Sequence, residues 1–266
     1  MDIANIPLSL YVHFPWCVRK CPYCDFNSHE IPERLDESAY VDAVLRDLEV
    51  DAPLVSGRRA GSVFFGGGTP SLLSGPSLAR LLEGIRHTVG LEAGAEITVE
   101  ANPGAVDSQH FAAYREAGVN RLSIGVQSFD DGMLSALGRI HTAADALAAF
   151  RSARQAGFDQ INLDLMFGLP RQDVDGVTAD IHQALELDPT HLSWYQLTIE
   201  PHTVFAHAPP PGIPDDEALW AMQEAGGALL AAAGYERYEV SAWAQAGSQC
   251  RHNRNYWEFG DYIGVG

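Results

Sequence analysis

Three cysteines lie within one short segment of this chain, Cys17–Cys24, and have the spacing C-x3-C-x2-C. Thiolates are the usual protein ligands of iron–sulfur clusters, and three of them on one loop can hold three irons of a cubane 4Fe–4S cluster. The fourth iron then has no protein ligand and stays open to a small molecule. The spacing therefore predicts a 4Fe–4S cluster on Cys17, Cys21 and Cys24 with one open iron.

A zinc site with His29 as the fourth ligand is the alternative for this segment. Structural zinc sites are closed by four ligands, often from two pairs of closely spaced cysteines, and the sequence has no second pair. Inert core cysteines are a third possibility, although three so close together in a loop cannot all be buried. The clustering also differs from the spread of cysteines in a disulfide framework. The fourth cysteine, Cys250, is far away, and no role is assigned to it.

Short runs of β-branched and aromatic residues alternate with longer helical patterns, which predicts β-α units in series and an α/β fold with a parallel sheet. Because such crossovers are right-handed, the sheet is expected to curl into a barrel or partial barrel. The predicted strands are Leu8–Phe14, Ser62–Phe65, Glu96–Glu100, Arg121–Val126, Gln160–Phe167 and His191–Ile199. The predicted helices are Glu37–Leu48, Ser77–Val89, Ser108–Ala117, Ala143–Ala156, Val174–Glu186 and Asp215–Ala233.

Polar or glycine-rich segments stand at the end of nearly every predicted strand. Active sites of parallel barrels collect at the carboxyl ends of the strands, so these segments are expected to share one rim with the cysteine loop. A purely structural barrel has no need for this coincidence. The segments are Gly66–Pro70, Glu100–Pro103, Gln127–Ser128, Asp164 with Gly168–Pro170, and Thr198–Pro201.

Composition narrows the classes of function. The chain has 266 residues, 46% of them hydrophobic, and a formal net charge of −18. So acidic a surface repels phosphate backbones and anionic lipid, which argues against nucleic-acid and membrane-surface binding. No apolar run approaches the roughly 20 residues of a membrane span, and the N-terminus carries no secretion signal. We therefore expect a cytoplasmic protein.

The segment Tyr11–Trp16 and the cysteines after it resemble the radical S-adenosylmethionine (SAM) superfamily. The similarity to its HemN-like branch, the oxygen-independent coproporphyrinogen oxidases and their HemW relatives, covers essentially the whole chain. The resemblance implies a partial (β/α)6 TIM-like barrel. It also implies that the open iron binds the methionine part of SAM, and that an electron from the cluster cleaves SAM to methionine and a 5′-deoxyadenosyl radical. Cofactor and cluster would carry this chemistry, and the protein would position them.

The same resemblance gives ligand-binding roles to ten further positions, for SAM or a second ligand. Taken alone, each also fits a glycine turn, a half-buried aromatic or an ordinary charge. Asp164 is the least ordinary of them, because it places a carboxylate in an apolar strand. The positions are Tyr11, Tyr23, Gly67, Gly68, Thr69, Glu100, Gln127, Arg139, Asp164 and Thr198.

Two features separate the branches of this family. The oxidases have a further cysteine two positions after the third, where this chain has Phe26. The segment His252–Trp257 matches the H-N-x-x-Y-W motif of HemW, a branch understood to bind haem and deliver it to recipient proteins. An imidazole beside Tyr256 and Trp257 can offer haem a ligand and aromatic faces, whereas the alternative is a His252 that bonds locally among core aromatics. We expect His252 near the barrel mouth or on an accessible face.

The resemblance thus favours a haem chaperone of the HemW type, with a coproporphyrinogen III oxidase as the alternative. It implies haem or porphyrin, a haem-recipient protein and an electron donor such as flavodoxin or ferredoxin as partners. The expected organisation is a barrel over residues 1–233 and the start of a C-terminal region over 234–266. Family members continue from there into a mainly helical domain, so we expect this chain to be truncated.

Overall fold

A computed structural model describes residues 6–55, 57–105 and 108–266. Within these residues the main sheet has the strand order β11-β1-β4-β5-β6-β7-β8-β10-β9, and β2 pairs with β3 apart from it. The strands are β1 (Leu8–Phe14), β2 (Trp16–Cys17), β3 (His29–Glu30), β4 (Ala60–Gly67), β5 (Leu91–Ala101), β6 (Arg121–Gln127), β7 (Gln160–Phe167), β8 (His191–Gln196), β9 (Glu236–Arg237), β10 (Ala242–Ala244) and β11 (Asp261–Val265). The helices are α1 (Glu37–Asp51), α2 (Gly75–Thr88), α3 (Ser108–Ala117), α4 (Asp131–Ala136), α5 (Ala143–Gln155), α6 (Val174–Glu186), α7 (Val204–His207), α8 (Asp216–Ala232) and α9 (Arg251–Trp257).

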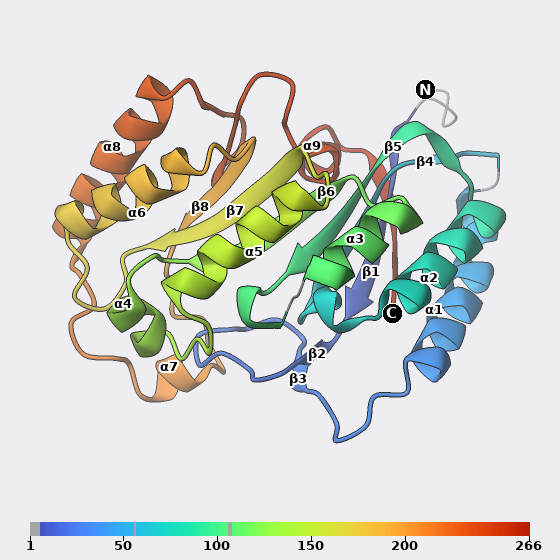
Figure 1. Ribbon diagram of the computed structural model, residues 1–266, viewed down its shortest axis with the longest axis horizontal. Helices are drawn as coiled ribbons and strands as arrows, with labels where there is room; N and C mark the ends of the chain where they lie inside the picture. The colour runs from blue at the N-terminus through green and yellow to red at the C-terminus, as the bar shows by residue number, and fades with distance from the viewer. Residues whose placement is uncertain (1–5, 56, 106–107) are drawn as a thin grey trace.

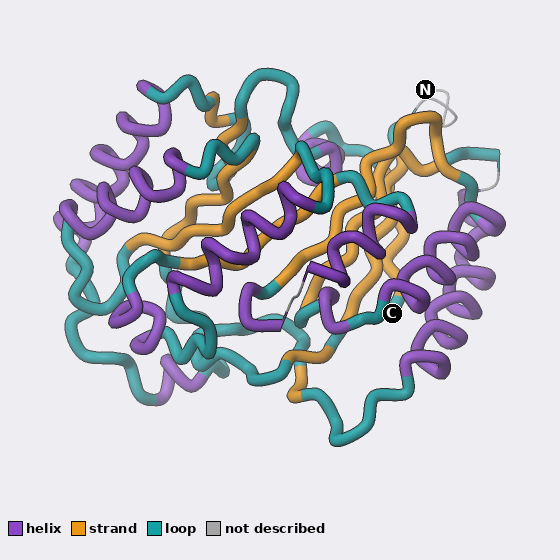
Figure 2. Tube along the Cα trace, in the orientation of Figure 1, coloured by secondary structure: helices purple, strands orange, loops and turns teal. Residues whose placement is uncertain are grey.

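The six predicted strands form the parallel centre of this sheet. Parallel pairing runs from β1 to β4 and on through β5, β6 and β7 to β8. Figure 2 shows these strands as one twisted band with the long helices along it. The edge strands β11 and β9 do not pair with each other, so the barrel stays open. The predicted α/β partial barrel is confirmed.

The two faces of the sheet have different surroundings. Leu10, Val12 and Phe14 alternate along β1 and are buried, and the Phe14 ring meets Tyr40 of α1 at 5.4 Å. Such alternation is what a strand needs to pack one face against a helical layer. The other face of β1 carries Tyr11, which stacks on neighbours inside the curve of the sheet. The helix-covered face therefore holds the core, and the inner face is free for polar chemistry.

Local sequence signals explain where the helices begin. Side chains of Asp36, Ser74 and Asp215 accept hydrogen bonds from backbone N–H groups in the first turns of α1, α2 and α8. Thr142 and Asp145 form a reciprocal capping box at α5. Each cap satisfies a backbone donor that the helix itself leaves unpaired. These caps fix the crossovers that order the strands.

The short elements were missed by the sequence analysis. The antiparallel β9–β10 pair extends the sheet beyond β8, and β11 pairs in parallel with β1. Helix α9, just before β11, lies against β1 and β4 on the inner face, at the end opposite the cysteine loop (Figure 1). Most of the missed elements have two to five residues, which is too few to show a periodicity. Among the described residues, no helix has the length and apolar character to cross a membrane.

Candidate cluster and cofactor site

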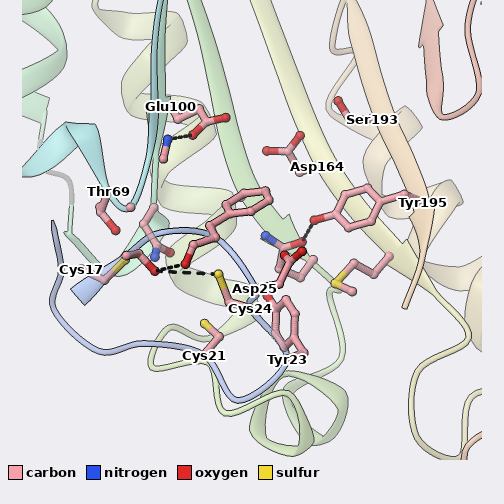
Figure 3. Close-up of a pocket in the computed structure, with 18 of the residues that line it drawn as sticks. Cys17, Cys21, Tyr23, Cys24, Asp25, Thr69, Glu100, Asp164, Ser193 and Tyr195 are labelled. Atoms are coloured by element: carbon pink, nitrogen blue, oxygen red, sulfur yellow. Dashed lines mark hydrogen bonds between the residues drawn. The ribbon is translucent and has the colours of Figure 1, made fainter. Parts of the chain in front are cut away.

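The three clustered cysteines line one cavity at the carboxyl ends of the strands. All three are unpaired and partly exposed, and they lie on the wall of a cavity of about 590 Å³ (Figure 3). His29 is exposed and does not line it. Within the described part of the chain, no three His, Cys, Asp or Glu side chains are grouped so that they could hold one metal ion. His29, the fourth ligand of the alternative zinc site, thus lies outside the cavity that the three cysteines line.

Backbone hydrogen bonds hold the cysteine loop against the end of β4. Gly68 N–H donates to Phe14 O at 2.6 Å, and Thr69 N–H donates to Trp16 O at 2.8 Å. Lys20 Nζ closes the loop by donating to Phe26 O at 3.0 Å and Ser28 O at 3.1 Å. Segments far apart in sequence thereby fix where the thiols point.

Close packing of protein against protein explains the glycines after β4. A Cβ on Gly68 would lie 2.5 Å from Trp16 O, and one on Gly67 would lie 2.6 Å from the His13 ring. Gly67 also has φ +112, in the region that favours glycine. The sequence analysis attributed these glycines to close approach of a ligand. The structure adds a different reason, because any side chain here would push the cysteine loop away.

Two carboxyl groups line the cavity, and neither forms a salt bridge with a described residue. Glu100 accepts from Gly67 N–H at 3.1 Å, and burial, reinforced by Asp164, raises the pKa of Glu100 to about 8. Asp164 accepts from Asn162 Nδ2 at 2.7 Å and from Ser123 Oγ at 3.1 Å. Burial raises the pKa of Asp164 to about 6 against these hydrogen bonds. Unpaired buried carboxylates are costly unless a ligand supplies the positive charge.

Gln127 reaches the cavity through an unusual backbone. Its φ of +69 coincides with a register shift between β6 and β7, and its Oε1 accepts from Tyr195 O–H at 2.8 Å. Strained backbone of this kind persists only where the surroundings fix it. Asp180 of α6 supplies that support by accepting from Phe129 N–H at 2.7 Å and Ser128 Oγ at 2.8 Å.

Arg139 and Tyr23 close the cavity near the second cysteine. Arg139 Nη1 donates to Cys21 Sγ at 3.4 Å, and Nη2 bonds to Gly125 O and Asn102 Oδ1. Burial works against the charge of Arg139, but the neighbouring Tyr23 and Cys21 raise its pKa above the ordinary value. The Tyr23 ring lies 6.3 Å from Phe205, and burial raises its pKa. A fixed cation is therefore in place beside one thiol.

Thr69 is a neutral hydrogen-bonding partner of the first cysteine. Burial raises the pKa of the Cys17 thiol, and a hydrogen bond with the Thr69 side chain lowers it. Thr198, in the loop after β8, also lines the cavity. Thus most of the predicted positions meet at one mouth. Those that line it are Cys17, Cys21, Cys24, Tyr23, Gly67, Gly68, Thr69, Glu100, Gln127, Arg139, Asp164 and Thr198.

Tyr11 and His252 do not line the cavity. Tyr11 lies behind it, with its hydroxyl 3.1 Å from His13 Nδ1 and its ring 6.0 Å from that of His252. His252 is 6% exposed, its ring stacks 4.6 Å from Phe64, and burial lowers its pKa to about 4. The expected place near the mouth or on an accessible face is wrong, because the apolar rings of β1 and β4 cover this imidazole. Tyr256 is close by, at 5.0 Å, as expected.

Sequence reasoning missed lining residues of β8, among them Ser193 and Tyr195. Both alternate with Leu192 and Trp194, which are buried in the core. That period of two was a signal that they face the inside of the barrel.

Cys250 is buried and its thiol lies 3.4 Å from Glu96 Oε1. Burial raises the pKa of Cys250 to about 12, so it remains a neutral thiol.

The residues of the cavity fit a cluster with SAM as its partner. Three free thiols supply ligands for three irons. Glu100 and Asp164 form no salt bridge with any described residue, and SAM carries an ammonium and a sulfonium group that two such unpaired carboxyl groups can bind. The donor set thus accommodates both groups in one cavity.

Comparisons with known proteins agree with this geometry. A model of the radical SAM superfamily matches residues 11–183. The chain is 55% identical over 260 residues to the heme chaperone HemW of Escherichia coli, covering 98% of this chain and 68% of that protein. It is 52% identical over 264 residues to the heme chaperone HemW of Haemophilus influenzae, covering 98% and 69%.

Among solved structures, the chain is similar to coproporphyrinogen III oxidase (HemN) from Escherichia coli, described as a radical SAM enzyme. The TM-score is 0.86 with 27% identity, over 99% of this chain and 64% of that one. The radical SAM superfamily implies a 4Fe–4S cluster and SAM. By these matches the chain belongs to the radical SAM superfamily and, within it, to the HemW family.

Proposed function

We propose that this chain binds a 4Fe–4S cluster on Cys17, Cys21 and Cys24, binds SAM in the adjoining cavity, and binds haem for delivery to a recipient protein. The observation that carries the haem proposal is the 55% identity to a heme chaperone, against 27% to the oxidase of the same fold. Phe26 supports it, since it stands where the oxidases are expected to have a cysteine, and its side chain lines the cavity.

The chain's own groups prepare the site. Arg139 Nη1 donates a hydrogen bond to Cys21 Sγ, and the Thr69 side chain forms a hydrogen bond with Cys17 that partly offsets the rise in the Cys17 pKa caused by burial. Asp164 provides negative charge for a cationic ligand, and Glu100, whose raised pKa of about 8 keeps it mostly protonated at neutral pH, becomes charged as such a ligand binds. When bound, the cluster supplies the electron for reductive cleavage of SAM. Tyr23 and Tyr195 border the cavity as buried aromatic side chains.

An electron donor such as flavodoxin or ferredoxin would approach the cysteine loop from its exposed side. Val18 is 47% exposed and Phe26 58% exposed on this surface, and Arg19 lines the cavity beside them. Exposed apolar side chains next to a cation are suited to a transient partner of opposite charge.

The cytoplasmic location and the domain boundary at residue 233 remain predictions.

Haem would meet the outer face of α9. Tyr256 is 44% exposed and Trp257 is 57% exposed, so this helix offers aromatic surface next to the buried His252. For His252 to ligate the iron, α9 must move away from Phe64 and Tyr11. The motif therefore joins an accessible aromatic face to a covered imidazole.

Two incubations of anaerobically reconstituted protein test this function. Haem alone should give the absorbance spectrum of protein-ligated iron, and His252→Ala should change it, whereas the exposed His207→Ala should not. Coproporphyrinogen III with SAM and a reductant should be recovered unchanged. Decarboxylation of that substrate by a full-length protein would support the oxidase function instead. Absence of haem binding would refute the proposed haem-chaperone function.

A further inference from the structure

A continuous chain of hydrogen bonds connects the motif segment of α9 with Asp164 in the cavity. Cys250 N–H and Asn253 Nδ2 lie 3.2 and 3.3 Å from the Tyr238 hydroxyl. That hydroxyl lies 2.7 Å from His191 Nε2. His191 Nδ1 lies 2.6 Å from Asn162 Oδ1, and Asn162 Nδ2 lies 2.7 Å from Asp164 Oδ1.

Asp164 fixes the direction of every bond in this chain. An ionised carboxylate only accepts, so the amide of Asn162 must turn its Nδ2 toward Asp164 and its Oδ1 toward His191. The imidazole must then carry its proton on Nδ1. Its Nε2 is left as an acceptor, and the Tyr238 hydroxyl donates to it. Cys250 N–H and Asn253 Nδ2 donate to the same hydroxyl oxygen.

All the donors therefore point from α9 toward Asp164. His191 is 1% exposed and Asn162 is 4% exposed, and burial lowers the pKa of His191 well below its ordinary value, which keeps the ring neutral. Aligned hydrogen bonds in a low-dielectric interior polarise and strengthen one another. The last donor in the line then stabilises the charged form of Asp164 more than an isolated amide would.

We propose that His191 and Tyr238 are positioning residues that hold Asp164 oriented and charged for a cationic ligand, and that they extend the role of the motif residue Asn253 to the SAM cavity. This inference deepens the proposed SAM site and rests on it. None of these residues touches the cluster loop's cysteines. Hydrogen bonds thus connect the motif, at the far end of the barrel, to Asp164 in the cavity.

Tyr238→Phe tests the proposal with the loss of one oxygen atom. SAM affinity of the reconstituted variant, measured by equilibrium dialysis at pH 7, should fall roughly tenfold, the effect of about one lost hydrogen bond to a charged site. The iron content should not change. The matched control is Tyr235→Phe, since the Tyr235 hydroxyl donates to Pro189 O and Gln245 lies next to it, away from the cavity.

The pH dependence separates positioning from general loosening. SAM affinity should rise with pH as the carboxylates ionise, and Tyr238→Phe should move the midpoint of that rise to higher pH. The other titratable groups that act on Asp164 are Glu100, Arg139 and Tyr195, and Tyr238→Phe leaves all three in place. A weaker affinity with an unchanged midpoint would overturn the proposal, as would a variant indistinguishable from the wild type.

The protonation state of His191 gives a readout that needs no SAM. In ¹⁵N spectra of histidine-labelled protein, the signals lost in His191→Gln should report a neutral ring with its proton on Nδ1. A proton on Nε2 would reverse the chain and refute it. If the wild type fails to bind SAM, the proposed SAM site is wrong. The position of the His191 proton still tests the direction of the hydrogen-bond chain. If Asp164→Asn weakens binding and Tyr238→Phe does not, the site stands and this inference falls.

Discussion

Gly68→Ala isolates the contact that holds the cysteine loop on the sheet. The added Cβ would lie 2.5 Å from Trp16 O and 2.9 Å from Phe14 O, and both are backbone atoms that no rotamer change can move. The loop must therefore shift, which weakens the hydrogen bonds from Gly68 N–H to Phe14 O and from Thr69 N–H to Trp16 O. Overpacking costs roughly 1–3 kcal/mol, and each hydrogen bond contributes about 1 kcal/mol.

A total of about 3 kcal/mol corresponds to a factor of roughly 100 in the population of the open loop. After anaerobic reconstitution, transfer of iron to a chelator should therefore be roughly 100-fold faster in Gly68→Ala than in the wild type. Gly227→Ala is the control: its Cβ would meet Trp243 at an ordinary 3.6 Å, and alanine within α8 should stabilise the helix. A Gly68→Ala protein that held iron as firmly as the wild type would refute this account of the loop.

Three more outcomes follow from the cavity. Asp164→Asn should weaken SAM binding by roughly 30-fold or more, as loss of one charge of a buried pair does, while iron and sulfide per chain stay the same. Glu100 ionises near pH 4.5 unfolded and about 8 folded, so the ligand-free protein should lose stability as pH rises across that interval; urea unfolding at several pH values should show the loss, and Glu100→Gln should remove that part of it. Asp180→Asn should cost about 1–2 kcal/mol of unfolding free energy and weaken SAM binding through Gln127, whereas the exposed Asp159→Asn should leave both unchanged.

Much of the fold could be predicted because its signals are local. Alternating burial along β1 follows from the alternation of apolar and polar residues in its own sequence. The rule that sites gather at the carboxyl ends of parallel strands then placed Glu100 and Asp164 in one cavity with the cysteines.

The rest depends on contacts between distant segments. His252 was expected to be accessible, but Phe64, nearly two hundred residues earlier, covers its ring. The support that Asp180 gives to the strained Gln127 crosses from α6 to β6. The hydrogen bonds between Asn162, His191 and Tyr238 need strands and a hairpin in register. Local sequence patterns do not predict which distant residues will contact one another.

The measurement that tests the central claim most directly is the electron paramagnetic resonance spectrum of the reduced, reconstituted protein with and without SAM. The account predicts about four irons per chain, a signal of a reduced 4Fe–4S cluster, and a change in that signal when SAM is added, because one iron has no protein ligand. A protein in which Cys17, Cys21 and Cys24 are all alanine should show no such signal. A cluster that still assembled in that triple variant, or a wild-type signal unaffected by saturating SAM, would contradict the account.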